Sequence, residues 1–158
     1  MLALVIILVA IERMLPPLPM LPPQFGRIGI SNVIVMYVVF FLGKRDAIVM
    51  AVLKAFFTFL MRGAMAAVLS LVGGLLSVLF IILLWHIFKD RISYVALSIF
   101  GAIGHNMGQL LMATLILQTP ALFAAYLPFM LIAGAIFGTI TGIFLNIIMP
   151  IFNRLYKH

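Results

Sequence analysis

The sequence predicts an all-α integral membrane protein, a single helical bundle with about six transmembrane helices over residues 1–158. Hydrophobic residues make up 66% of the 158 residues, and charged residues only 8%. Soluble domains are about half apolar and about a quarter charged, so three acidic and ten basic residues could not cover a water-facing surface. The apolar runs are continuous, which argues against a barrel of short strands with alternating polarity.

Six apolar segments follow one another between polar or proline-containing breaks. They are Met1–Leu15, Ile28–Leu42, Ala47–Met61, Ala64–Ile87, Ile92–Leu117 and one between Ala121 and Phe152. A helix needs roughly 20 residues to cross about 30 Å of hydrocarbon, so the first three segments are short for a full crossing. The first lacks the basic leader and the cleavage site of a secretory signal, and we expect it to be a retained helix.

Prolines mark the two irregular places in this pattern. Residues 16–27 contain five prolines, which block a helix and favour an extended path. We expect this apolar stretch outside the bundle, either as a stiff linker or as a lid over the outer mouth. Thr119-Pro120 is typical of a helix start, and Pro128 should kink or restart that helix. A short external helix before the last crossing is therefore expected.

Basic residues set the orientation. With the N-terminus inside, the cytoplasmic side receives Lys44, Arg45, Lys89, Arg91, Arg154 and Lys157, and the outside receives Arg13, Arg27 and Arg62. Six against three agrees with the positive-inside bias, so we predict an N-in/C-in topology with Trp85 and Tyr94 near the inner boundary. The net charge of +7 lies in short connectors between apolar runs, so no nucleic-acid partner is expected.

Small residues indicate close helix packing. Two glycine series are present, Gly134, Gly138 and Gly142, and more loosely Gly101, Gly104 and Gly108. Glycines let helix backbones approach in lipid, and we favour packing inside the bundle over a docking face for another protein. Ser70, Gly74 and Ser77 share one face of the fourth segment, and we interpret them as packing residues as well.

Lys54 lies halfway along the third segment, where a charge costs about 2.5–3.5 kcal/mol on insertion scales. Thr58 and Arg62 follow at four-residue steps, so all three residues should share one side of the helix. Lys54 either faces a ligand or finds backbone carbonyls or Glu12 as partners inside the bundle.

The fifth segment carries His105-Asn106-Met107-Gly108-Gln109. His105 and Gln109 are one turn apart and Asn106 is adjacent, so we expect one helix face to offer several donors and acceptors. Interhelical hydrogen bonding is the alternative to ligand binding for this run. The full set of candidate solute-binding residues is Arg27, Asn32, Lys54, Arg62, His105, Asn106 and Gln109, all in the outer half of the predicted bundle. Their positive charge favours an anionic or carbonyl-rich solute.

Motifs for catalysis are missing from the sequence. It has no P-loop, no cysteine, and only two aspartates, Asp46 and Asp90. The three histidines, His86, His105 and His158, are too scattered to form a metal site. We therefore predict no catalytic residue, no metal and no cofactor, and we do not expect the chain alone to be an enzyme.

Four stretches resemble a known family of small bacterial membrane proteins. They are Gly26-Arg-Ile-Gly-Ile-Ser-Asn-Val33, Leu42-Gly-Lys-Arg-Asp-Ala47, Ser70-Leu-Val-Gly-Gly-Leu-Leu-Ser77 and Gly104-His-Asn-Met-Gly-Gln-Leu-Leu111. They resemble the Gx transporter family, which is often labelled heptaprenyl diphosphate synthase component I. That family is grouped with the S components of energy-coupling-factor (ECF) importers. The resemblance covers most of the chain, and the His-Asn-x-Gly-Gln run is its most specific part.

The resemblance implies an S-component-like bundle in the bacterial cytoplasmic membrane that captures a small solute outside. Its partners would be a membrane scaffold subunit and two cytoplasmic ATPase subunits. S components commonly dock through Ala-x-x-x-Ala on the first helix, whereas here Ala3 and Ala10 are seven residues apart. The alternatives are an accessory subunit in prenyl diphosphate or quinone biosynthesis, although Asp-rich motifs are missing, and a structural membrane assembly protein.

Overall fold

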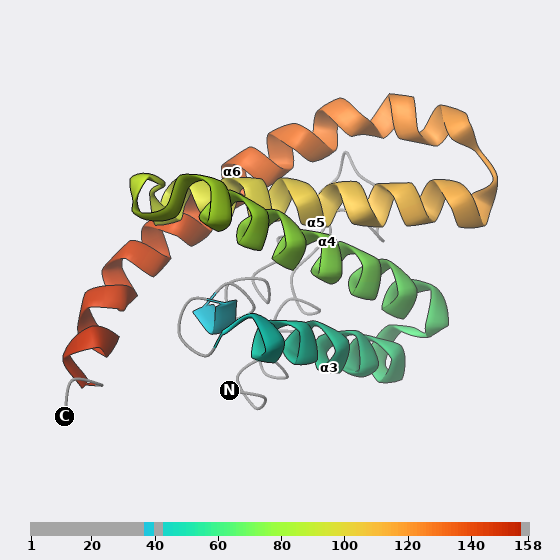
Figure 1. Cartoon of the computed structure of the whole chain (residues 1–158). Helices are drawn as coiled ribbons and strands as arrows, with labels where there is room; N and C mark the ends of the chain where they lie inside the picture. Colours follow the sequence, from blue (N-terminus) through green and yellow to red (C-terminus); the bar gives the residue numbers. More distant parts are fainter. Residues whose placement is uncertain (1–36, 40–42, 156–158) are drawn as a thin grey trace.

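The computed structural model describes residues 37–39 and 43–155, and gives only the backbone of residues 90, 148, 149 and 151–155. In this part of the chain four long helices are joined by short turns (Figure 1). They are α3 (Lys44–Arg62), α4 (Ala64–Phe88), α5 (Tyr94–Leu117) and α6 (Pro120–Leu155), with a 3₁₀ turn, η1 (Lys89–Arg91), between α4 and α5. The third to fifth predicted segments are confirmed to within a few residues, and the all-α class is confirmed for the described residues. Segment Met1–Leu15 and the loop at 16–27 lie outside the described residues, as does most of Ile28–Leu42.

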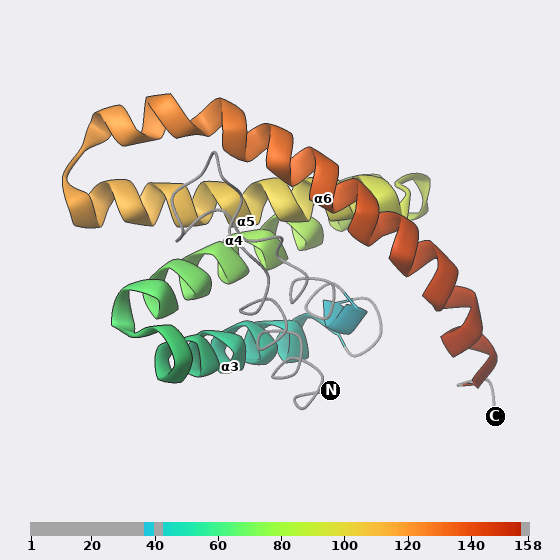
Figure 2. The same cartoon turned by 180° about the vertical axis from the view of Figure 1, so that it is seen from behind.

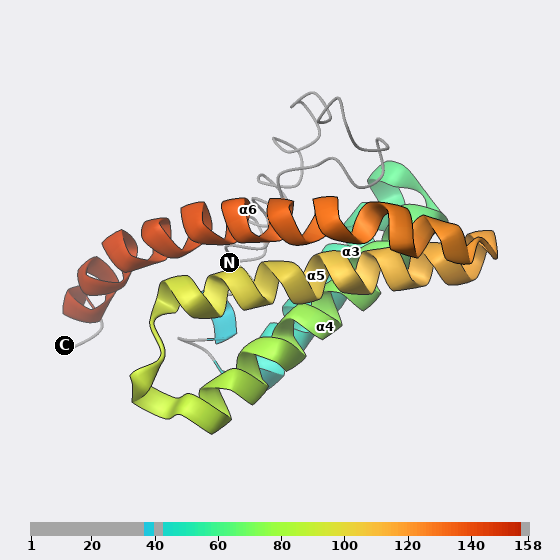
Figure 3. The ribbon, with the colours of Figure 1, turned by 90° about the horizontal axis from the view of Figure 1, so that it is seen from above.

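The helices pack mainly on their neighbours in the sequence, α3 on α4, α4 on α5 and α5 on α6. Consecutive helices run in opposite directions, and the same order is visible from both sides (Figures 1 and 2). Seen from above, α6 follows α5 along most of the length of α5, while α4 crosses α5 at an angle (Figure 3). The described part is therefore a layer of antiparallel helices with α4 between α3 and α5.

Glycines of α6 form its contact with α5, as the four-residue repeat predicts. A methyl group on Gly138 would lie 2.5 Å from Cα of Ile99, and one on Gly142 would lie 2.5 Å from Cα of Val95. These distances are too short for any side chain, so the two helix backbones touch directly at these points. The prediction that this glycine series packs inside the bundle is confirmed.

Two apolar clusters stabilise the layer, one toward each end of the helices. The first joins all four helices and consists of Tyr37, Val38, Ala47, Met50, Val78, Ile81, Leu97 and Leu145. The second joins α4, α5 and α6 at the opposite end and consists of Leu69, Leu110, Ala113 and Met130. Burying one such side chain contributes about 1.5–3 kcal/mol in a water-soluble protein. In lipid the contribution comes from packing, which the close helix contacts provide.

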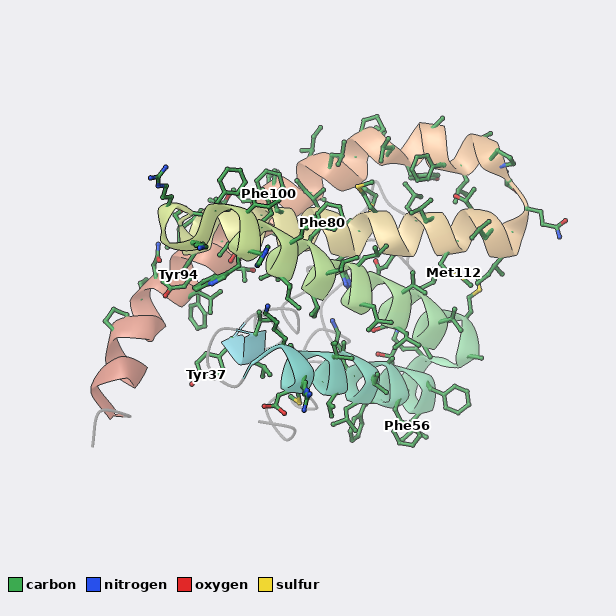
Figure 4. The ribbon with its side chains drawn as sticks, viewed as in Figure 1. Tyr37, Phe56, Phe80, Tyr94, Phe100 and Met112 are labelled. Atoms are coloured by element: carbon green, nitrogen blue, oxygen red, sulfur yellow. The ribbon has the colours of Figure 1, made fainter. Side chains whose placement is uncertain are left out.

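Three of the described helices are long and apolar enough to cross a membrane: α4, α5 and the Pro120–Ile147 part of α6. The shorter α3 has 19 residues and carries five charged ones, yet its outward side is apolar. Val52, Phe56 and Leu60 are each about half exposed, and Phe56 projects from α3 away from α4 (Figure 4). We therefore count three candidate spans among the described residues and keep a crossing by α3 as a prediction.

The basic residues gather at one end of the layer. The start of α3, the α4–α5 turn and the end of α6 lie on the same side in Figure 1, opposite the α3–α4 and α5–α6 turns. Lys44, Arg45, Lys89 and Arg91 are exposed there. The rings of Trp85 and Tyr94 lie 6.5 Å apart across the α4–α5 turn, which places both aromatic residues at this end. Their position at the inner membrane boundary stays a prediction. The arrangement agrees with one membrane surface being more basic than the other.

The last helix differs from the prediction at Pro128. A separate short helix before the final crossing is wrong, because α6 continues through Pro128 and Pro150 for 36 residues. Thr119 precedes the helix, but its hydroxyl donates to the carbonyl oxygen of Leu117 (2.9 Å) and so satisfies the end of α5. Prolines within membrane helices are tolerated because neighbouring groups satisfy the backbone that they release.

Candidate functional site

The buried face of α3 carries the lysine that the sequence singles out. Lys54 is only 5% exposed and Thr58 4%, while the rest of this face is mostly alanine. The Thr58 hydroxyl donates to the backbone carbonyl of Lys54 at 2.8 Å. The predicted placement of Lys54 and Thr58 on one side of the helix is confirmed, and that side faces the protein.

Small residues bring α3 close to α4 beside Lys54. A methyl group on Gly74 would lie 3.2 Å from Cβ of Ala51, which fixes the level at which the two helices meet. The two helices are antiparallel, so Lys54 lies about 4.5 Å along α3 from Ala51, and Ser70 lies about 6 Å in the same direction along α4 from Gly74. Lys54 and Ser70 therefore lie at about the same level of the layer.

The neighbouring glycine, Gly73, faces α5. A methyl group placed there would lie 2.9 Å from both Nδ1 of His105 and Cγ of Gln109, so these two side chains pack against Gly73. His105 is only 6% exposed. Three helices thus contribute polar groups to one buried region, which we call the Lys54–His105 cluster: Lys54, Ser70, His105 and Gln109.

Two polar atoms in this cluster make no hydrogen bond, Oγ of Ser70 and Nδ1 of His105. Both atoms are fully enclosed, and a buried polar group without a partner typically costs about 1–3 kcal/mol. Such groups in a native structure call for a specific explanation, and a bound molecule is one of them.

Asn106 belongs to a different contact. Its Nδ2 donates to the backbone carbonyl of Met130 on α6 at 2.9 Å, whereas His105 and Gln109 face α4. The prediction that these polar side chains share one helix face is therefore wrong for Asn106, because adjacent residues point about 100° apart and the run 105–109 is divided between two interfaces. Interhelical hydrogen bonding, the alternative weighed for this run, applies to Asn106.

The remaining candidates lie elsewhere. Arg62 is the last residue of α3, partly buried, and about 12 Å along the helix from Lys54 at 1.5 Å per residue. Arg27 and Asn32 lie outside the described residues. Ser70 was not among the candidates, because a serine spaced with Gly74 and Ser77 is more typical of packing.

The chemistry of the cluster is that of binding. One ammonium, one hydroxyl, one imidazole and one carboxamide can hold an anionic or carbonyl oxygen by charge and hydrogen bonds. Within the described residues, no group of three histidine, aspartate or glutamate side chains could hold a metal ion. The polar region is enclosed by helices whose outer faces are apolar.

Fold and composition define a helical membrane protein with a buried polar cluster. A model of the family described as heptaprenyl diphosphate synthase component I matches residues 1–148, so the chain belongs to this family. No curated protein and no solved structure matches the chain. The family label that the sequence resembles is thereby confirmed, whereas the similarity to ECF S components stays a prediction.

Proposed function

We propose that the protein is a membrane-embedded solute-binding subunit of the S-component type. It captures a small anionic or carbonyl-rich solute, similar to a vitamin or to a quinone or isoprenoid precursor, from the outer face of the bacterial cytoplasmic membrane. The observation that supports this function best is the burial of Lys54 on α3, Ser70 on α4 and His105 on α5, three consecutive helices of the layer. Polar and ionisable groups inside a membrane are costly, and they typically mark substrate pathways.

The proposal includes an external source of energy. The sequence has no P-loop, so a membrane scaffold subunit and two cytoplasmic ATPases would drive release of the solute to the inside. The solute-facing residues would be Lys54, His105 and Gln109 in the described part, joined by Arg62, Arg27 and Asn32 from the predicted outer half. We propose no catalytic role for the chain by itself.

A thermal-shift screen tests solute binding. The purified protein is heated with water-soluble vitamins, quinone precursors and prenyl diphosphates, and a bound solute raises the unfolding temperature. Lys54→Gln and Arg62→Gln should each weaken binding of an anionic solute, with the larger loss at the buried Lys54. Lys89→Gln is the matched control. Lys89 is exposed in the α4–α5 turn, at the end of the layer away from Arg62. Unchanged affinity in both Lys54→Gln and Arg62→Gln would contradict the proposal.

The family description favours a second candidate, an accessory membrane subunit in prenyl diphosphate or quinone biosynthesis. Prenyl diphosphate synthases need Asp-rich magnesium motifs, and this sequence has only Asp46 and Asp90, so catalysis would belong to a partner. Purification from native membranes distinguishes the two functions. A prenyl diphosphate synthase that copurifies supports the accessory role, and ATPase subunits with a scaffold support import.

A further inference from the structure

The hydroxyl of Ser70 behaves differently from the threonine hydroxyls on the same bundle. Those of Thr58, Thr114 and Thr139 each donate to the backbone carbonyl four residues earlier, at 2.7–2.8 Å. In an apolar environment a serine or threonine hydroxyl in a helix commonly makes this hydrogen bond to the carbonyl oxygen four residues earlier. Oγ of Ser70 is fully enclosed and makes no such bond. Any partner of this hydroxyl would have to come from outside its own helix.

The position of Ser70 on α4 shows where that partner would lie. At about 100° per residue, Ser70 falls between Gly73 and Gly74 around the helix axis. Gly73 packs on His105 and Gln109 of α5, and Gly74 packs on Ala51 of α3. Ser70 consequently lies on the side of α4 between its contacts with α3 and with α5, about one turn from these contacts and at about the level of Lys54.

We propose that Ser70 is a solute-binding residue that, with Nδ1 of His105, recognises an uncharged hydroxyl, carbonyl or amide group of the solute. This inference rests on the proposed function and adds a substrate class to it. A serine hydroxyl can donate and accept, and an imidazole adds a ring nitrogen as a second hydrogen-bonding group, so the pair suits a neutral polar group. Lys54, at the same level, suits the anionic part of the same molecule. The solute is then a carboxylate that also carries hydroxyl, carbonyl or amide groups.

Ser98 provides a matched control for Ser70. Its Oγ is also enclosed and makes no hydrogen bond, and the residue is fully buried. It lies at the other interface, where a methyl group on Gly142 would approach Cβ of Ser98 to 3.2 Å. Ser70→Ala and Ser98→Ala therefore remove the same kind of group from two different places.

The experiment compares both variants with the unaltered chain in thermal unfolding and in binding of defined probes. The probes are pantothenate and 4-hydroxybenzoate, with hexanoate and benzoate as carboxylates that lack the neutral polar groups. We expect at least one polar probe to bind more tightly than its plain analogue. Ser70→Ala should weaken that binding about tenfold, the value of one buried hydrogen bond, and Ser98→Ala should leave it unchanged.

The unfolding temperature without any probe shows whether a variant loses binding or is simply less stable. Both variants should unfold at the same temperature as the unaltered chain or higher, because each removes an unpaired polar group. Equal binding by Ser70→Ala and the unaltered chain, or equal binding of the plain analogues, would overturn the assignment of Ser70 while solute binding stands. If no compound in the full screen, prenyl diphosphates included, stabilises the protein, the proposed solute-binding function is contradicted. The assignment of Ser70 is then contradicted as well, because it rests on that function.

Discussion

At the scale of single residues, Asn106 shows how a polar side chain stabilises helices in lipid. Its amide joins α5 to the carbonyl of Met130 on α6. Asn106→Ala should lower the free energy of unfolding by about 0.5–1.5 kcal/mol, the range for interhelical hydrogen bonds in membranes. Unfolding in mixed detergent micelles measures it. Thr139→Val is the control, because the Thr139 hydroxyl bonds only within α6 and joins no two helices. An equal loss in both variants would mean that the Asn106 bond does not hold the helices together.

Residue spacing predicted part of the site correctly. The burial of Lys54 and Thr58 on one face follows from the helical repeat, because residues four apart share a side. Asn106 was grouped with His105, yet adjacent residues on a helix point about 100° apart, and the two reach different neighbours. Ser70 was missed because its unpaired hydroxyl becomes visible only when α3 and α5 are placed beside α4.

At the scale of helices, α5 and α6 touch through backbone, and this contact makes Gly138 intolerant of any side chain. In Gly138→Ala the new methyl group would lie 2.5 Å from Cα of Ile99, so the helices must move apart. We expect a loss of about 1–3 kcal/mol or more in the free energy of unfolding. Ile140→Ala on the exposed side of the same helix is the control. If Gly138→Ala costs no more than Ile140→Ala, the close contact is not present in the membrane.

The connection between α3 and α4 limits substitution for a different reason. Gly63 alone joins the two helices, with φ 85° and ψ 177°, and a methyl group there would meet nothing within 4 Å. This backbone conformation is nearly exclusive to glycine, so Gly63→Ala should cost about 1–3 kcal/mol through strain alone. Equilibrium unfolding of the variant measures the cost, and unchanged stability would show that the helices can be joined in another way.

The apolar runs located the described helices well because their breaks coincide with glycine, proline and clustered charges. The continuity of α6 was not predicted. Proline usually ends a helix in water, and nothing local in the sequence shows that α5 lies beside α6 to support it. The positions of the helices can therefore be predicted from the local sequence pattern. Whether a helix continues through a proline depends on the helices that pack beside it.

At the scale of the whole molecule, orientation links the site to its solute. Lys44, Arg45, Lys89 and Arg91 crowd one end of the layer, and the positive-inside bias assigns this end to the cytoplasm. Lys54 lies ten residues from the start of α3, beyond its midpoint in the direction of the opposite end. With that orientation, Ser70, in the second turn of α4, lies toward the outer surface, and Lys54 and His105 lie at about mid-depth. A solute-capturing subunit of the proposed type would be entered from that outer side.

Cysteine accessibility decides this orientation, because the chain has no cysteine of its own. Asp90→Cys places a thiol in the α4–α5 turn while keeping Lys89 and Arg91, and Thr119→Cys places one in the turn between α5 and α6. In intact cells a membrane-impermeant maleimide should label Thr119→Cys, and it should label Asp90→Cys only after permeabilisation. The reverse pattern would put the basic end outside, against the positive-inside bias, and would move the polar cluster toward the cytoplasm. Import from the outer face would then lose its geometric basis, whereas an accessory role beside a cytoplasmic enzyme would gain one.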